Sequence, residues 1–184
     1  MSDLLKTHRR LLAQWRKTMN LVGPGDLSEH YDDAERALRW LATSGLPLAG
    51  RWVDLGTGAG FPGIVLAAMY PELEVDLVDS RSKRCAFLNR VLTEAQIDPK
   101  RVRVHCTRVE TLPAGQWDGV VSRAFAPPPE ALGHARRLLV PGGTALLFLQ
   151  EDTEAPQVEG FEVFHVEHYE AGGKRRKAVG LTVR

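Results

Sequence analysis

The chain has 184 residues, of which 43% are hydrophobic and 26% charged, and its formal net charge is +1. This composition is typical of a soluble globular protein of one domain, and no apolar run approaches the ~18 residues of a membrane-spanning helix. The two cysteines form no CxxC pair, which argues against a disulfide framework or a zinc site. The N-terminus also lacks the pattern of a signal peptide, so we expect a cytoplasmic protein.

The near-neutral total hides a segregation of charge along the chain. Residues 81–108 carry eight Lys or Arg against two acidic residues. In contrast, residues 26–35 carry five acidic residues and residues 151–170 carry seven, with no Lys or Arg in either segment. Such asymmetry creates a field that can orient a polyanion against one face. The alternative is an ordinary solvated surface.

The first part of the chain is predicted to be helical. Apolar residues recur at helical spacing over residues 3–19, which predicts an amphipathic helix. A second helix is expected over residues 28–43, with Ser28 as its N-cap and Ser44-Gly45 as its end. We treat residues 1–45 as an N-terminal helical segment.

From residue 51 onwards, short apolar strands alternate with helices. The predicted strands are 51–55, 75–79, 101–106, 117–122 and 144–150. The predicted helices are 62–69, 82–95 and 129–140, the last one closed by Pro141-Gly142-Gly143. This order predicts an α/β fold in which a parallel sheet has helices on both faces.

The end of the chain departs from this alternation. Two strand-like runs at 161–170 and 178–184 are joined by a turn that contains glycine, which predicts an antiparallel hairpin. A mostly parallel, Rossmann-like sheet finished by such a hairpin is the outline of the class I methyltransferases that depend on S-adenosylmethionine (SAM). We therefore expect residues 46–184 to form one compact SAM-binding domain.

The loop GTGAGFPG at residues 56–63 is the strongest candidate for a ligand site. It satisfies GxGxxG, which alone is a weak signal for NAD, because an NAD site places a pyrophosphate at the helix N-terminus. Asp54, just before the loop, would repel a pyrophosphate but not a cationic ligand. Asp79 ends the next strand, where an acid can accept hydrogen bonds from ribose hydroxyls. We therefore favour SAM, approached closely by the backbone at Gly56 and Gly58.

Two further turns face the same crevice, at the carboxyl ends of the strands. After the third strand, Val109 and Glu110 are candidates for flanking an adenine, through a backbone amide and a carboxylate. After the fourth strand stands Arg123, whose planar guanidinium suits a carboxylate, a phosphate or an edge of guanine. The alternative for both turns is an ordinary surface charge.

Several motifs occur in a specific order that covers most of the chain. They are MNL at 19–21, His30 with Asp33, VDLGTGAGFPG at 53–63, LVDSRSKRCAFL at 77–88, RVETLP at 108–113 and DGVVSRAFA at 118–126. In these motifs the chain resembles the RsmG (GidB) family of 16S ribosomal RNA (rRNA) guanine-N7 methyltransferases. The resemblance implies that the cofactor site is lined by Gly56, Phe61, Val109, Glu110 and Arg123.

Methylation at N7 of guanine requires no general base, because this nitrogen carries an unprotonated lone pair at neutral pH. Catalysis would then come mainly from orientation, and we assign Arg123 to positioning and no residue to proton transfer. Arg81, Lys83 and Arg84 are expected to contact RNA phosphates, and KRRK at 174–177 is a further candidate. The expected partner is 16S rRNA or the small ribosomal subunit.

Two alternatives stay open at this point. Where members of the family usually carry Lys-Gly, this chain has Leu149-Gln150, so one alternative is a SAM-binding, RNA-associated protein with weak or no catalysis. The other is an NAD-dependent oxidoreductase. We expect a monomer and no metal site.

Overall fold

A computed structural model describes residues 2–19, 21–22, 26–43 and 50–184. Its helical elements are α1 (Asp3–Met19), α2 (Leu27–Arg39), η1 (Trp40–Thr43), α3 (Gly63–Met69), α4 (Ser82–Glu94), η2 (Val109–Thr111) and α5 (Pro128–Leu138). Its strands are β1 (Arg51–Leu55), β2 (Glu74–Asp79), β3 (Val102–Cys106), β4 (Trp117–Arg123), β5 (Leu139–Gln150), β6 (Phe161–Ala171) and β7 (Lys174–Val183). Asn20, Ser44-Gly45 and the expected boundary at residue 45 lie outside the described residues.

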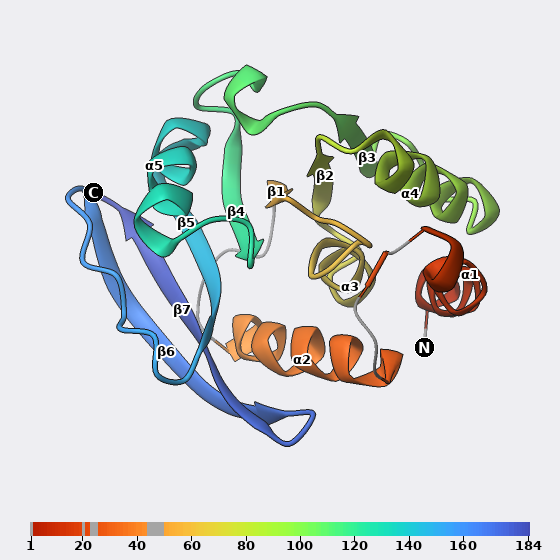
Figure 1. Cartoon of the computed structure of the whole chain (residues 1–184). Helices are drawn as coiled ribbons and strands as arrows, with labels where there is room; N and C mark the ends of the chain where they lie inside the picture. Colours follow the sequence, from red (N-terminus) through yellow and green to blue (C-terminus); the bar gives the residue numbers. More distant parts are fainter. Residues whose placement is uncertain (1, 20, 23–25, 44–49) are drawn as a thin grey trace.

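The seven strands form one sheet in the order β3-β2-β1-β4-β5-β7-β6. The first five strands are parallel, and β7 pairs antiparallel with both β5 and β6. The predicted α/β fold with a C-terminal antiparallel hairpin is therefore confirmed. Helices α1, α2, α3 and α4 lie on one side of the sheet and α5 lies on the other (Figure 1).

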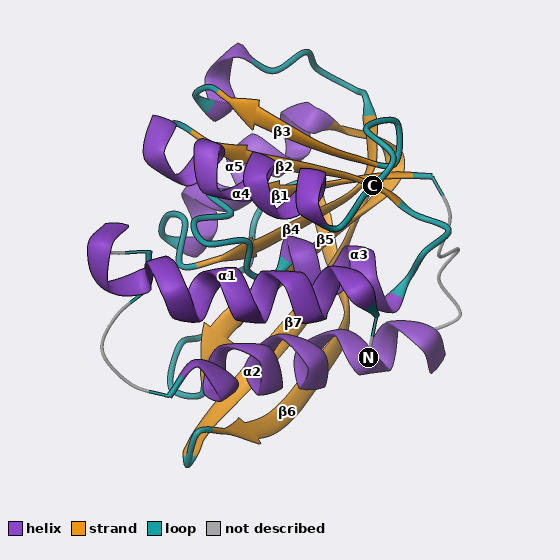
Figure 2. Cartoon of the chain, turned by 90° about the vertical axis from the view of Figure 1, so that its right-hand side faces the viewer, coloured by secondary structure: helices purple, strands orange, loops and turns teal. Residues whose placement is uncertain are grey.

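The N-terminal helices belong to the main core. Leu4, Leu12 and Leu38 are buried in the same cluster as the residues of α3, α4 and one face of the sheet. Figure 2 shows both helices in that layer, and the ring of His8 from α1 contacts that of Tyr31 from α2. Because these helices bury their apolar stripes on the sheet domain, they take part in positioning its loops.

Three predicted details were wrong. Helix α2 is capped by Asp26, whose Oδ1 accepts a hydrogen bond from the Ser28 amide at 2.9 Å, rather than by Ser28. The α-helix ends at Arg39 and continues as a 3₁₀ turn, so its predicted end was too late. The predicted helix end at Pro141-Gly142-Gly143 is also wrong, because α5 ends at Leu138 and these three residues lie inside β5. The register of the β4–β5 pairing shifts between Trp117 and Gly119 of β4, so β5 contains a local bulge.

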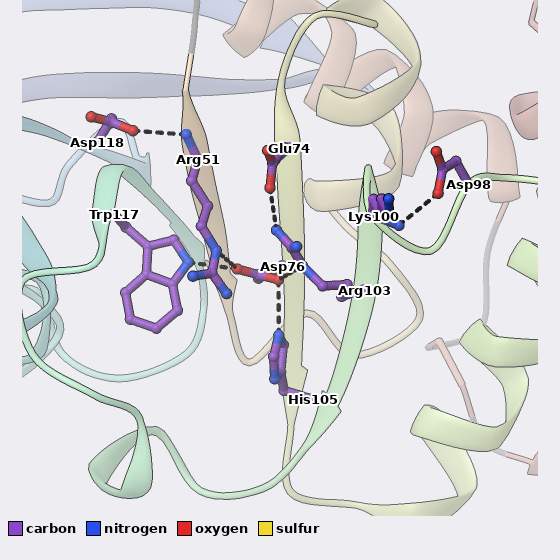
Figure 3. A network of polar contacts seen from close by, with 9 residues as sticks. All are labelled: Arg51, Glu74, Asp76, Asp98, Lys100, Arg103, His105, Trp117 and Asp118. Carbon is purple, nitrogen blue, oxygen red and sulfur yellow. Dashed lines mark hydrogen bonds and ion pairs between the residues drawn. The ribbon is translucent and has the colours of Figure 1, made fainter.

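Among the described residues, β3 is joined to β4 by a segment whose only helical element is the short 3₁₀ turn η2, and α5 lies over β4 and β5. A polar cluster lies around Asp76 of β2 (Figure 3). The buried Asp76 carboxylate accepts hydrogen bonds from Arg51, Arg103, His105 and Trp117 at 2.5–2.8 Å. These four donors hold the pKa of Asp76 well below its usual value against the effect of burial, which raises it.

Candidate functional site

The carboxyl ends of β1 to β4 surround a cavity of about 380 Å³, which we call the first cavity. Its lining residues are Gly56, Val78, Asp79, Ser80, Arg81, Arg84, Thr107, Arg108, Val109, Glu110, Ala124 and Phe125. This volume lies within the range of small-molecule sites, and the place is where open α/β sheets bind ligands. The loops predicted to face one crevice therefore do meet there.

The glycine loop is shaped by close contacts. Gly56 has a φ of +66°, and a Cβ atom there would lie 2.6 Å from the ring of Phe125. The Thr57 amide donates a hydrogen bond to the carbonyl of Val78 at 2.9 Å, which ties the loop to β2. A side chain at Gly56 would therefore displace Phe125, which also lines the first cavity.

Asp54 lies beneath this loop and is absent from the cavity lining. Its side chain is fully buried, and Oδ2 accepts a hydrogen bond from the Gly63 amide at 2.8 Å. Burial raises the pKa of Asp54 to about 7. The expectation that Asp54 presents a charge to the ligand was wrong, because the carboxyl group instead ties the loop to the start of α3.

Asp79 stands at the end of β2 in the cavity wall, and only 5% of it is exposed. Its Oδ1 accepts a hydrogen bond from the Arg81 amide at 2.8 Å and its Oδ2 one from the Gly58 amide at 3.0 Å. The guanidinium of Arg84 also contacts Oδ2, at 3.1 Å. Gly58 itself does not line the cavity, but its amide fixes the carboxylate that does.

The residues assigned to RNA separate into two groups. Arg81 and Arg84 line the first cavity, and Arg84 is engaged by Asp79. Lys83 is exposed on the first turn of α4 and lies outside the cavity lining. The structure thus places Arg84 beside the cofactor candidate Asp79 and leaves Lys83 facing solvent.

Val109 and Glu110 both line the first cavity from η2, the turn after β3. Val109 is buried, and its carbonyl accepts a hydrogen bond from Arg137 at 2.7 Å. The Glu110 side chain is 62% exposed, and its nearest ionisable partner is His134 at 3.9 Å. The carboxylate of Glu110 is therefore available to a ligand.

Arg123 and Phe61 do not line the first cavity. Phe61 is buried against the rings of His8, His30 and Tyr31, at centroid distances of 4.8–5.4 Å. The Arg123 guanidinium lies 5.1 Å above the Phe61 ring. Phe61 thus packs the underside of the loop, and Arg123 faces a different space.

That space is a second cavity of about 200 Å³. It is lined by Asp33, Arg123, Ala124, Ala126, Pro128, Phe148, Leu149, Gln150, Thr153, Tyr169 and Arg176. The Arg123 guanidinium contacts Asp33 Oδ2 at 2.8 Å, and the Tyr169 hydroxyl donates to Asp33 Oδ1 at 2.8 Å. Ala124, at a φ of +53°, lines both cavities and forms the boundary between them.

Sequence reasoning missed most of this second cavity. In the sequence, Asp33 was noted only as part of a family motif. Both Tyr169 and Arg176 come from the C-terminal hairpin, Tyr169 from the edge strand β6 and Arg176 from β7, which pairs with β5 and β6. No local signal marked Tyr169 as a partner of Asp33, which is 136 residues away in sequence.

His8 connects helix α1 to the glycine loop. It is fully buried, and its Nε2 lies 2.6 Å from the carbonyl oxygen of Ala59. Since a carbonyl oxygen can only accept, Nε2 carries the hydrogen, and Nδ1 accepts from the Tyr31 hydroxyl at 2.6 Å. Burial lowers the pKa of His8 to about 4. Neutral His8 thus joins α1 and α2 to the loop.

Two kinds of feature are absent from residues 2–19, 21–22, 26–43 and 50–184. No helix among them is long and apolar enough to cross a membrane. They also contain no group of three or more His, Cys, Asp or Glu side chains arranged to hold a metal ion.

The sequence matches the family model described as GidB, rRNA small subunit methyltransferase G, over residues 1–176. Relatives of that name include the protein of Cellvibrio japonicus, 39% identical over 150 residues that cover 79% of this chain and 67% of the relative. For the Hydrogenovibrio crunogenus protein the identity is 42%, covering 72% of this chain and 60% of the relative. For the Paracoccus denitrificans protein it is 32%, covering 84% and 79%. The chain thus spans between three fifths and four fifths of these relatives.

Solved methyltransferases share the fold. Magnesium protoporphyrin IX methyltransferase from Synechocystis, solved with bound SAH, superposes with a TM-score of 0.67 over 100% of both chains at 15% identity. A SAM-dependent methyltransferase from Aquifex aeolicus gives a TM-score of 0.65 over 91% of this chain and 98% of that one, at 17% identity. Together with the family match, this excludes the nicotinamide alternative. The chain belongs to the rRNA small subunit methyltransferase G (GidB, RsmG) family, whose members are SAM-dependent enzymes that methylate 16S rRNA.

Proposed function

We propose that this chain transfers the methyl group of SAM to N7 of a guanine in 16S rRNA, with the cofactor in the first cavity and the guanine in the second. The observation that carries this proposal is that two cavities of unequal size share Ala124 at the carboxyl ends of the strands. A cavity of about 380 Å³ suits a nucleoside cofactor, and one of about 200 Å³ suits a single base. Their common wall is where two reactants would meet.

The residues of the first cavity fit SAM. The Asp79 carboxylate accepts from the ribose hydroxyls, which requires the Arg84 guanidinium to leave Oδ2 or to share it. Glu110 accepts from the exocyclic amine of the adenine, and the amide at Val109 donates to a ring nitrogen. Gly56 lets the backbone approach the ligand, and Phe61 supports the loop from below. When bound, the cofactor supplies an electrophilic methyl group.

The second cavity orients the base and leaves N7 free to attack. Because N7 has an unprotonated lone pair, no side chain needs to remove a proton. Aligning the reactants can by itself lower a barrier by about 7–11 kcal/mol in favourable cases. Arg123 is held by Asp33 and by the ring of Phe61, so it is a rigid part of the cavity wall. Its role is to position the base.

RNA approaches from the side of α4. The exposed Lys83 contacts phosphates, and Arg81 at the rim of the first cavity assists it. Such contacts give an affinity that falls steeply with salt and supply little sequence choice. The target guanine is unpaired, because an A-form groove hides the base edges. We expect the protein to act as a monomer in the cytoplasm, on 16S rRNA or on the small ribosomal subunit.

The test uses SAM labelled on its methyl group with 16S rRNA and with small subunits. Wild-type protein should transfer label to one of these substrates. Asp79→Ala should weaken SAM binding by about 1–3 kcal/mol, the range of charge-assisted hydrogen bonds, and should slow transfer at limiting SAM. Tight SAM binding without any transfer would instead support the SAM-binding, RNA-associated alternative. Unchanged SAM affinity in the variant would remove Asp79 from the cofactor site.

A further inference from the structure

The side chains that line the second cavity carry more positive than negative charge. Among its lining residues the charged side chains are Asp33, Arg123 and Arg176. One carboxylate therefore faces two guanidinium groups, which leaves a net charge of about +1 in a partly buried space. Such an excess favours a ligand that brings a negative charge of its own.

Arg176 is the source of this excess. Asp33 already accepts from Arg123 at one oxygen and from Tyr169 at the other, both at 2.8 Å. Arg176 Nε lies farther away, 3.5 Å from Asp33 Oδ1, and this buried atom has no hydrogen-bond partner among the described residues. The guanidinium is thus attracted to the carboxylate, and it belongs to a lining residue of the second cavity whose Nε–H has no acceptor among the described residues.

The fold holds Arg176 in this place. It lies on β7 between two pairing strands, opposite Gln150 of β5 and Tyr169 of β6, and both of these residues also line the second cavity. Its side chain is 32% exposed, whereas that of the neighbouring Arg175 is 77% exposed and pairs with Glu151 at 3.5 Å. Adjacent arginines therefore differ sharply in what they can bind.

The positive charge of Arg123 and Arg176 also affects the pKa of His30. Burial lowers its pKa most, and Arg123 and Arg176 lower it further, whereas Asp33 and Glu29 raise it.

The planar guanidinium of an arginine such as Arg176 matches the oxygens of a phosphate, which it can contact through two hydrogen bonds.

We propose that Arg176 binds the phosphate of the nucleotide whose base enters the second cavity. This inference rests on the proposed function. The proposal places the Arg176 guanidinium on the phosphate of the nucleotide and not on its base. This placement matters because the purine becomes positively charged as the methyl group arrives. A guanidinium without a carboxylate partner on the ring edge would oppose that change, whereas Arg123 is paired with Asp33 and Arg176 on the phosphate fixes the nucleotide without opposing it.

The experiment compares GMP with guanosine, which differ only in the phosphate. Their affinities for the full chain saturated with S-adenosylhomocysteine are measured by calorimetry, for wild type, Arg176→Gln, Arg176→Lys and the matched control Arg175→Gln. Wild type and Arg175→Gln should prefer GMP by roughly ten- to hundredfold, the range of charge-assisted hydrogen bonds. Arg176→Gln should lose most of this preference, and Arg176→Lys should keep part of it, because lysine retains the charge but not the fork.

Equal affinities in wild type would overturn the inference, as would a full preference in Arg176→Gln or no GMP binding at millimolar concentration. Affinity for S-adenosylhomocysteine and the melting temperature should be the same in all four proteins, so a folding defect would be visible. Methyl transfer to rRNA by the same wild-type preparation tests the proposed function separately, since it can succeed while the phosphate assignment fails.

Discussion

Replacing His8 with glutamine should remove a pH-dependent part of the protein's stability. In the native state the neutral ring donates to the carbonyl of Ala59 and accepts from Tyr31. Protonation would place a second hydrogen on Nδ1, which then could no longer accept from the Tyr31 hydroxyl. Glutamine offers an NH₂ group that can donate to Ala59 and a carbonyl oxygen that can accept from Tyr31, but it does not titrate in this range.

The magnitude follows from the pKa of His8, which is about 4 in the folded protein against 6.5 in an unfolded chain. Between these values the unfolded state binds more protons, so stability falls as the pH falls from 6.5 to 4. Linkage gives a loss of about 2 kcal/mol between pH 7.5 and pH 5. Asp54 titrates in the opposite direction, but it is present in both proteins and therefore cancels in their difference.

The assay is urea unfolding of wild type and His8→Gln at pH 7.5 and pH 5, followed by fluorescence. At pH 7.5 the variant should be the less stable protein, because it loses ring contacts with Phe61 and Phe87. At pH 5 this difference should shrink by about 2 kcal/mol. A difference that stays constant with pH, or grows at pH 5, would refute the assignment of a neutral His8.

Three further changes test other parts of the site. Asp54→Asn should raise the free energy of unfolding at pH 8 by on the order of 1–4 kcal/mol, because the raised pKa of about 7 makes the charged form of Asp54 unfavourable in the folded protein. In wild type, Asp54 lowers the stability as the pH rises from about 4 to 7, and urea titrations of the variant should lack this fall. An unchanged pH profile of stability would contradict this expectation. Gly56→Ala should weaken SAM binding more than about tenfold in calorimetry, because the new Cβ would meet Phe125; retained affinity would show that the loop can yield. Lys83→Ala should lower rRNA affinity in a filter assay and reduce the salt slope by about 1, and a loss of SAM affinity would contradict its placement outside the cofactor cavity.

The parts of this protein that could be predicted from sequence are those whose cause is local. The glycines of the loop indicate a backbone that must approach another group closely. Asp79 ends an apolar strand, and the topology fixes where that end lies. Val109 and Glu110 follow the next strand in the same manner. All three residues line the first cavity because the carboxyl ends of parallel strands share one edge.

The parts that could not be predicted depend on distant segments. Arg123 was expected beside the cofactor, yet Asp33 from α2 and Phe61 hold it at the second cavity. Arg84 lies in a basic run that indicates a surface, but the carboxylate of Asp79 holds it in the first cavity. Arg176 belongs to a basic run at the start of β7, in which Arg175 is exposed and Lys177 is buried, and the register of β7 places it at the second cavity. These outcomes depend on tertiary pairing that no local pattern encodes.

The position of the transferred methyl group tests the account most directly. After reaction with 16S rRNA or small subunits, the labelled RNA is treated to cleave the chain at 7-methylguanine, and the product nucleoside is identified by mass spectrometry. We predict a single cleavage site at an unpaired guanine, with the label in 7-methylguanosine. Label on an exocyclic amine, on a ribose or on another base would contradict the arrangement of two adjoining cavities that leaves N7 free to attack.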